Sequence, residues 1–283
     1  MGGSYEASVL DRLHKAEMVI LKDFIAICEK YDINYFAIAG TAIGAVRHQG
    51  FIPWDDDIDI AMLREDYEKF AKVAPQEFAG KYEMMAPDLP KKYYNLQPAM
   101  VRLGTKFVTE NAWAGNYEPG LFLDLFIYEN IPDDEAEAAK IIKKCRTYKI
   151  LYIIRNINHF KLLKGRSLKQ KIKNIISGFI RLGLLLIPKS DRWLYNKYIS
   201  YATKYYGKSE TYTALCDPGS HIMGIKRDEI FPLVDMPFED ITIKMLNKYE
   251  DQLKRHMGEY MVIPPVEKRT NHCPLELDFG EDF

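Results

Sequence analysis

The sequence predicts an α+β fold in which helices flank a mixed β-sheet core and a helical, basic insertion interrupts the chain. Three observations support this class. Strand-like and helical segments alternate over the first half, residues 135–206 have mostly helical periodicity, and short strands return with one helix after 211. A chain of 283 residues, 47% of them hydrophobic, can bury a sizeable core, so disorder is expected only at the ends.

The spacing of apolar residues predicts each element. Steps of three or four predict the first helix, and the alternation of charged and apolar residues in DIDIAML predicts a strand. Gly104 predicts a turn between two strands, and Pro132 a break before the helical middle. Helices are expected over about 5–31, 41–49, 64–74, 135–206 and 245–258, and strands over 33–40, 57–63, 100–110, 120–129 and 236–245.

The charge is unevenly distributed along the chain. Residues 138–190 contain fourteen Lys or Arg and no Asp or Glu, which leaves 25 basic against 40 acidic residues elsewhere. Such asymmetry indicates either an anionic partner or a solvated face of basic helices that pairs with acidic neighbours. Inside this region, 174–188 is strongly apolar but contains Arg181 and is shorter than the ~20 residues of a membrane span. A core helix is therefore expected, with an interfacial helix on an anionic leaflet as the alternative.

Three domains are expected from these shifts in composition. They are a catalytic core over 1–132, a mainly helical basic region over 133–208, and a C-terminal α/β segment over 209–283 that packs back on the core. Four widely spaced cysteines and a polar N-terminus predict free thiols and a cytoplasmic location, with peripheral contact at the inner membrane face.

Four carboxylates stand close together in GFIPWDDDIDIAM, at Asp55, Asp56, Asp57 and Asp59. Burial of so many like charges is costly unless a cation compensates them. On a strand, Asp57 and Asp59 point to the same face and can share one or two hard cations. Asp124, alone in the apolar strand FLDLF, is a candidate third ligand or proton acceptor. The pattern predicts a Mg²⁺ site, with Mn²⁺ as an alternative ion.

Upstream of these acids, Gly40 and Thr41 fall where a strand meets a helix. Free backbone N–H groups at a helix start favour phosphate, and glycine permits its close approach. A phosphate cradle, a paired carboxylate strand and a further buried acid thus follow in chain order. This order resembles the nucleotidyltransferase fold, so the core is expected to be nucleotidyltransferase-like.

The longer run AGTAIGAVRHQGFIPWDDDIDIAM resembles the LicD family, which includes bacterial phosphocholine transferases and the fukutin-related enzymes. GLFLDLF and residues 257–272 resemble further parts of that family, and Ala39 stands where glycine is usual. The matching positions are Gly40, Thr41, Gly44, Ala45, Arg47, Gly50, Ile52, Pro53, Trp54, Asp55, Asp56, Asp57 and Asp59.

The resemblance implies a CDP-alcohol donor, commonly CDP-choline, and a glycan or lipid-linked glycan as acceptor. A hydroxyl of a cell-surface glycan or teichoic-acid-like precursor would receive the phospho-alcohol, and CMP would leave. Asp57, Asp59 and Asp124 are the expected catalytic and metal-binding residues.

Further residues are expected to bind substrate. Arg47 suits a bidentate phosphate contact or a structural pairing with Asp55 or Asp56, one of which could instead cap the turn after Pro53. Lys268 and Arg269 are expected to close on a phosphate, or else to form a solvated basic pair. Aromatic faces suit a quaternary ammonium, and the candidates are Tyr93, Tyr94, Trp113 and Tyr117.

Three other functions compete with this prediction. A nucleotidyltransferase that moves NMP from an NTP to a sugar phosphate or another small acceptor would use the same carboxylates. A nucleic-acid binder would leave the acidic cluster unexplained, and the basic region lacks regular aromatic interleaving, so no nucleic acid is expected as a partner. A calcium module is disfavoured because DDDID lacks the glycine and terminal glutamate of a calcium loop.

Overall fold

A computed structural model describes residues 5–89, 93–216 and 224–281. Its main sheet has the strand order β1-β2-β6-β4-β3, and β7 joins the far part of β6 and carries β8 on its other side. Only the β2–β6 pair among the described strands is parallel, so the sheet is mixed, as predicted. The strands are β1 (Phe36–Ala37), β2 (Asp59–Leu63), β3 (Tyr82–Met85), β4 (Ala99–Arg102), β6 (Phe122–Ile131), β7 (Thr211–Ala214) and β8 (Ile225–Lys226).

The N-terminal helices form as the apolar periodicity predicts. In α1 (Ala7–Lys30), Leu13, Ile20 and Phe24 recur at near-helical spacing and are fully buried in the main core. Helices α2 (Ala39–His48) and α3 (Arg64–Glu77) also fall where expected. The strand expected over 33–40 is much shorter, because α2 already begins at Ala39 and leaves only β1 before it.

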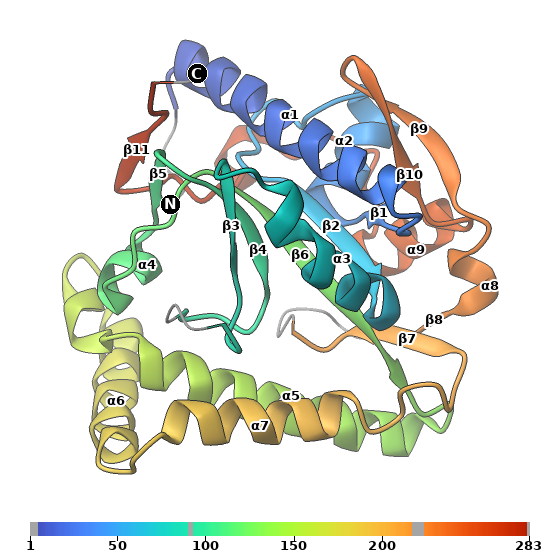
Figure 1. Cartoon of the computed structure of the whole chain (residues 1–283). Helices are drawn as coiled ribbons and strands as arrows, with labels where there is room; N and C mark the ends of the chain where they lie inside the picture. The colour runs from blue at the N-terminus through green and yellow to red at the C-terminus, as the bar shows by residue number, and fades with distance from the viewer. Residues whose placement is uncertain (1–4, 90–92, 217–223, 282–283) are drawn as a thin grey trace.

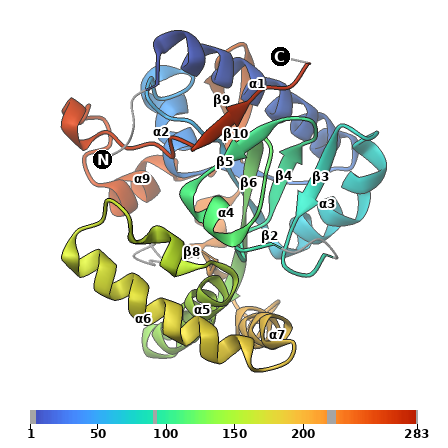
Figure 2. The same cartoon turned by 90° about the vertical axis from the view of Figure 1, so that its left-hand side faces the viewer.

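The middle of the chain is helical, as predicted. Figure 1 shows α5 and α7 side by side along one edge of the molecule, and Figure 2 shows α6 across the surface beside them. A separate apolar cluster that includes Ala138, Cys145 and Leu194 joins α5 to α7. The elements are α5 (Glu135–Asn156), the 3₁₀ turn η1 (His159–Leu163), α6 (Leu168–Leu185) and α7 (Ser190–Ala202).

The expectation of a core helix over 174–188 is wrong. Of residues 174–188, only Ser177 and Gly178 are buried, and most of the apolar side chains face outward. Gly178 is the contact point, because a Cβ there would lie 2.4 Å from the ring of Phe160. The helix therefore packs mainly through its small residues and Leu184, and it leaves most of its large apolar residues on the surface.

The C-terminal segment returns to the N-terminal part. β11 pairs with β5, and the β9–β10 hairpin lies beside α2 and β1. The two strands expected around Gly104 are β4 and β5, and the residue has the positive φ of 79° that a tight turn requires. They enter different sheets and do not form a hairpin. The remaining elements are α4 (Glu110–Gly115), β5 (Lys106–Val108), α8 (Arg227–Ile230), β9 (Val234–Phe238), β10 (Ile241–Met245), α9 (Tyr249–Met257), η2 (Val266–Lys268) and β11 (Glu276–Asp278).

Among the described helices, none combines the length and apolarity that crossing a bilayer requires. All four cysteines are free thiols, as predicted.

The division of the chain into three domains at 132 and 208 stays a prediction.

One ion pair is buried between the sheet and the helices. Arg64, the first residue of α3, pairs with Glu129 on β6, and their side chains are 10% and 1% exposed. The Arg64 Nε also donates to the Glu129 carboxylate at 3.1 Å. Removal of either partner would leave a charge in the interior without compensation.

We expect Arg64→Met to lower the free energy of unfolding by about 3–5 kcal/mol, because Glu129 would stay buried without a partner. The double variant Arg64→Met/Glu129→Met removes both charges and should recover most of that loss. Urea denaturation followed by circular dichroism measures both values. A loss below about 1 kcal/mol in the single variant would show that the pair is not a structural anchor.

Candidate active site

The parallel pairing of β2 with β6 brings the predicted carboxylates together. Asp59 and Asp124 are direct partners in the register of the two strands, so their side chains point to the same face of the sheet. Asp57 lies two residues before β2. The chain is held against β6 at the next residue, because the Asp124 N–H donates to the Ile58 carbonyl at 3.0 Å. One carboxylate oxygen from each of the three aspartates lies within 4.8 Å of the others.

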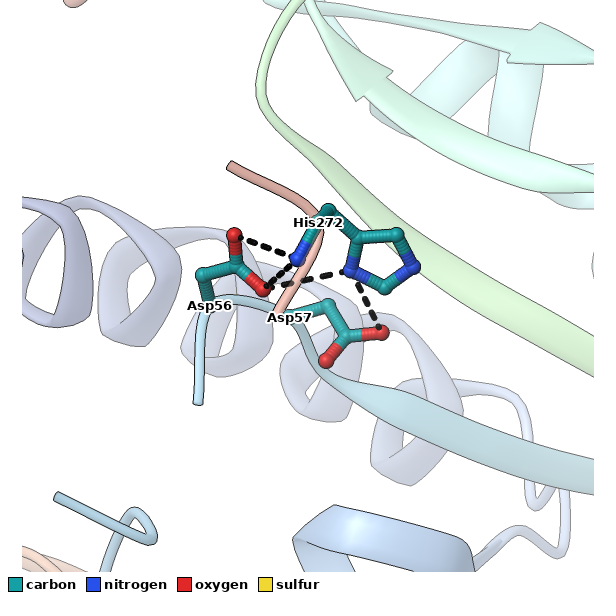
Figure 3. A group of neighbouring side chains, drawn as sticks. All are labelled: Asp56, Asp57 and His272. Atoms are coloured by element: carbon teal, nitrogen blue, oxygen red, sulfur yellow. Dashed lines mark hydrogen bonds and ion pairs between the residues drawn. The ribbon is translucent and has the colours of Figure 1, made fainter. Parts of the chain in front are cut away.

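His272 completes the site from the C-terminal segment. Its Nδ1 lies 3.2 Å from an oxygen of Asp56 and 3.6 Å from an oxygen of Asp57 (Figure 3). The sequence indicated no part for this residue in the carboxylate site. The only signal was its place at the end of the family-like stretch 257–272, because proximity to residues more than 200 positions earlier leaves no local pattern.

Asp56 holds this arrangement in place rather than facing solvent. Its side chain is fully buried and accepts hydrogen bonds from the backbone N–H groups of His272 and Cys273 at 2.8 and 3.0 Å. The Tyr5 hydroxyl donates to it at 2.6 Å. Desolvation alone would raise the pKa of Asp56, but the hydrogen bonds from His272 and Tyr5 outweigh it and lower the pKa. Asp56 thus ties Tyr5 near the N-terminus and residues 272–273 near the C-terminus to the loop that carries Asp55, Asp56 and Asp57.

Burial makes the cluster electrostatically unfavourable without a cation. Desolvation, together with the charge of Asp57, raises the pKa of Asp124 to about 7. Desolvation and the neighbouring acids also raise the pKa of Asp55 to about 8, and desolvation raises that of Asp57. The hydrogen bond to Asp56 and the charge of Asp57 raise the pKa of His272 to about 9, so the imidazole is positively charged at neutral pH.

These residues fit a divalent cation. Asp57, Asp59 and Asp124 offer only hard carboxylate oxygens, which are the ligands that Mg²⁺ and Mn²⁺ prefer. A bound cation would also offset the desolvation and repulsion that raise the pKa values of Asp57 and Asp124. Glu17 on α1 adds a further buried acid, missed by the sequence analysis. Desolvation and the charges of the Asp55–Asp57 loop raise its pKa well above the ordinary value, which favours a neutral side chain.

Gly40 and Thr41 support the acidic residues from the first turn of α2. The Thr41 hydroxyl accepts a hydrogen bond from the Asp59 backbone N–H at 2.8 Å. A Cβ on Gly40 would lie 2.3 Å from a carboxylate oxygen of Asp55, so only glycine lets that acid approach the helix start. Ile38 and Ala39, immediately before them, line the cavity.

Arg47 and Arg269 meet on the indole of Trp54. Their guanidinium carbons lie 5.8 and 4.2 Å from the Trp54 ring centre. Arg47 also donates to the Tyr260 carbonyl at 2.5 Å, which ties α2 to the C-terminal segment. Lys268, at the end of η2, is exposed. The structure thus brings Arg47 and Arg269 together, and it places Lys268 on the surface.

A cavity of about 1080 Å³ opens over the carboxylates, large enough for a nucleoside diphosphate with a small alcohol attached. Asp57, Asp59, Asp124 and His272 lie in its wall. Aromatic and basic side chains from distant elements complete the lining, among them Tyr93, Tyr94, Phe107, Phe122, Lys149 and Arg166. Tyr94 packs against Tyr93 and Tyr117 with ring centres 5.3 Å apart in each pair, whereas Trp113 is 46% exposed.

The chain is similar to known proteins of one family. Residues 32–132 match the family described as LicD/FKTN/FKRP, nucleotidyltransferase domain. The chain is 32% identical over 259 residues to the lipopolysaccharide cholinephosphotransferase LicD of Haemophilus influenzae, which covers 89% of this chain and 91% of that protein. Uncharacterized proteins of Rickettsia typhi and Rickettsia prowazekii are 46% and 44% identical over 57 residues, which is 20% of this chain and 18% and 21% of those proteins.

A carboxylate centre at the edge of a large cavity, together with these similarities, defines the protein as an enzyme of the transferase class. The chain belongs to the LicD family. The resemblance predicted from the run at residues 39–62 is thereby confirmed.

A substitution at Ala39 tests whether the backbone at the start of α2 is strained. It has a φ of 46°, a conformation that costs a residue with a Cβ about 1–2 kcal/mol. We expect Ala39→Gly to raise the free energy of unfolding by about 0.5–1 kcal/mol, because the relief exceeds the added chain entropy. Thermal and urea unfolding measure the change.

Ala42→Gly, in the same helix, is the matched control and should lower the free energy of unfolding by about 1 kcal/mol or more. Equal losses in both variants would contradict a strained backbone at Ala39.

Proposed function

We propose that the protein transfers phosphocholine from CDP-choline to a hydroxyl of a cell-surface glycan, with lipopolysaccharide as the first candidate, and releases CMP. The observation that carries this proposal is the convergence of Asp57, Asp59 and Asp124 on the wall of the large cavity. Similarity over most of the chain to a lipopolysaccharide cholinephosphotransferase supports the choice of substrates. We further infer that the core is nucleotidyltransferase-like and acts on a lipid-linked acceptor.

The donor's phosphates would lie between the start of α2 and the carboxylates. Ile38 and Ala39 line the cavity there, and the first N–H groups of a helix favour phosphate. The positively charged imidazole of His272, which lies beside Asp57 in the cavity wall, would offset part of the donor's negative charge. Lys149 contributes a second cation in the cavity wall, and its side chain is buried and donates to the Cys216 carbonyl.

Asp57, Asp59 and Asp124 would hold the divalent cation. When bound, the cation would neutralise charge on the donor's phosphates and make the phosphorus more electrophilic. Asp124 would accept the proton of the acceptor hydroxyl, whose oxygen then forms a bond to the distal phosphorus. The bond from that phosphorus to the bridging oxygen breaks, and CMP leaves with the electron pair. Most of the catalysis would be positioning and charge neutralisation.

The aromatic side of the cavity would receive the choline group. A quaternary ammonium is held by the faces of aromatic rings, and Tyr93 and Tyr94 both line the cavity. The competing proposal, NMP transfer from an NTP, uses the same carboxylates and could stack a nucleobase on these rings, so the released product distinguishes the two functions.

We expect Asp57→Asn, Asp59→Asn and Asp124→Asn each to lower kcat by at least about 100-fold, because each removes a ligand charge from the centre. The assay supplies CDP-choline, Mg²⁺ and a lipopolysaccharide acceptor, and mass spectrometry identifies the products. Asp66→Asn is the matched control, since Asp66 is buried but accepts from the Asn34 N–H outside the cavity.

Wild-type protein should release CMP and give a glycan with one added phosphocholine. Pyrophosphate release from an NTP, with no transfer from CDP-choline, would establish the competing function instead. Full activity in the Asp57 variant would remove that residue from the mechanism.

Tyr94 tests the choice of alcohol. We expect Tyr94→Ala to raise the KM for CDP-choline by about 5–30-fold, because a desolvated cation–π contact is lost, and to change the KM for CDP-glycerol much less. Tyr94→Phe keeps the aromatic face and should behave like the wild type. Equal increases in KM for both donors would assign Tyr94 to packing rather than to choline recognition.

A further inference from the structure

The exposed side of α6 is strongly apolar. The residues concerned recur at steps of three or four, which places them on one face of the helix. We call this surface the α6 apolar face, and its members are between 39% and 85% exposed. They are Leu168, Ile172, Ile175, Ile176, Phe179, Leu182 and Leu186. Contiguous apolar surface of this kind marks an interaction site on a folded protein.

Basic side chains border this face. Lys169, Lys171 and Lys173 are exposed in the first two turns of α6, and no acidic residue occupies the first turn. The helix macrodipole disfavours cations at a helix N-terminus, so these lysines do not serve the stability of the helix itself. They belong to the stretch 138–190, which contains fourteen basic residues and no acidic ones. This charge complements an anionic surface.

An anionic bilayer surface is the partner that combines both properties. Apolar side chains enter the boundary between head groups and acyl chains, while flanking lysines contact the anionic head groups. A second copy of the chain would present the same positive charge, which disfavours pairing of this face with itself. We propose that the α6 apolar face docks the protein onto membranes that contain anionic phospholipids.

Docking by this face would place the cavity close to the bilayer. Arg166 lines the cavity and pairs with Glu110, which lies in the same wall, and α6 begins two residues later at Leu168. Figure 2 shows α6 and α4, which carries Glu110, on the same side of the molecule. Membrane binding by this face is a property beyond the proposed function, and it can be measured without donor or acceptor.

The test is flotation of the full-length protein with phosphatidylcholine vesicles that do or do not contain phosphatidylglycerol. We expect binding only to the anionic vesicles, and its loss as salt is raised to about 0.5 M. Lys169→Ala/Lys171→Ala/Lys173→Ala should lower the partition coefficient by about 100-fold, since each lysine near an anionic surface contributes roughly fivefold.

Ile172→Glu and Val19→Glu form a matched pair. Both replace an exposed, β-branched helical residue, but Val19 lies on α1 at the opposite side of the molecule (Figure 1). Ile172→Glu should lower partitioning by at least about tenfold, and Val19→Glu should leave it within about twofold of wild type. Circular dichroism of each variant verifies the fold.

Phe179→Trp gives an independent reading that does not weaken the face. Its fluorescence should shift to the blue on addition of anionic vesicles and be quenched by brominated lipids, beyond the response of the wild type. Absence of vesicle binding at low salt, or equal binding of both vesicle types, would overturn the proposal. It would also be overturned if sedimentation velocity showed a dimer that Ile172→Glu dissociates, without vesicle binding.

Discussion

The parallel pairing of β2 with β6 is the contact on which the site depends. It sets Asp59 opposite Asp124, and a shift of one residue in this register would turn one of them to the far face of the sheet. The Thr41 hydroxyl and the Ile58 carbonyl reinforce the same register through the Asp59 and Asp124 backbone N–H groups. The fold thus holds like charges together that would separate in a free chain.

The site requires much more of the chain than the stretch that carries the family motif. The family match covers 32–132, yet Asp56 is held by Tyr5 before it and by His272 after it. Asp56 accepts hydrogen bonds from both segments and is fully buried, so its charge is compensated by donors from two distant parts of the sequence. Asp56, although it belongs to the motif, therefore has a structural role: it binds the N-terminal and C-terminal segments beside Asp55 and Asp57.

Local patterns sufficed for the long helices, for the strands β2 and β6, and for the shared face of the three carboxylates, but not for α4 or the length of β1. The alternation in DIDIAML and the lone acid of FLDLF predicted a shared face, because strand periodicity is a local property. His272 and Glu17 could not be found in this way, since their place beside the Asp55–Asp57 loop comes from tertiary packing. The stacking of Arg47 and Arg269 on Trp54 likewise joins residues more than 200 positions apart.

The error over 174–188 has a physical cause. Composition indicates that an apolar helix should be buried, but burial depends on which side of the helix meets the protein. In α6 the inner side includes Ser177 and Gly178, where the ring of Phe160 can approach the backbone, and most of the large apolar residues are left outside. Apolar side chains that stay in water contribute little to the free energy of folding. The α6 apolar face, with lysines at the helix end that disfavours positive charge, is therefore explained by a partner surface outside the protein. Because Arg166 lines the cavity and lies two residues before α6, that partner surface would lie close to the cavity.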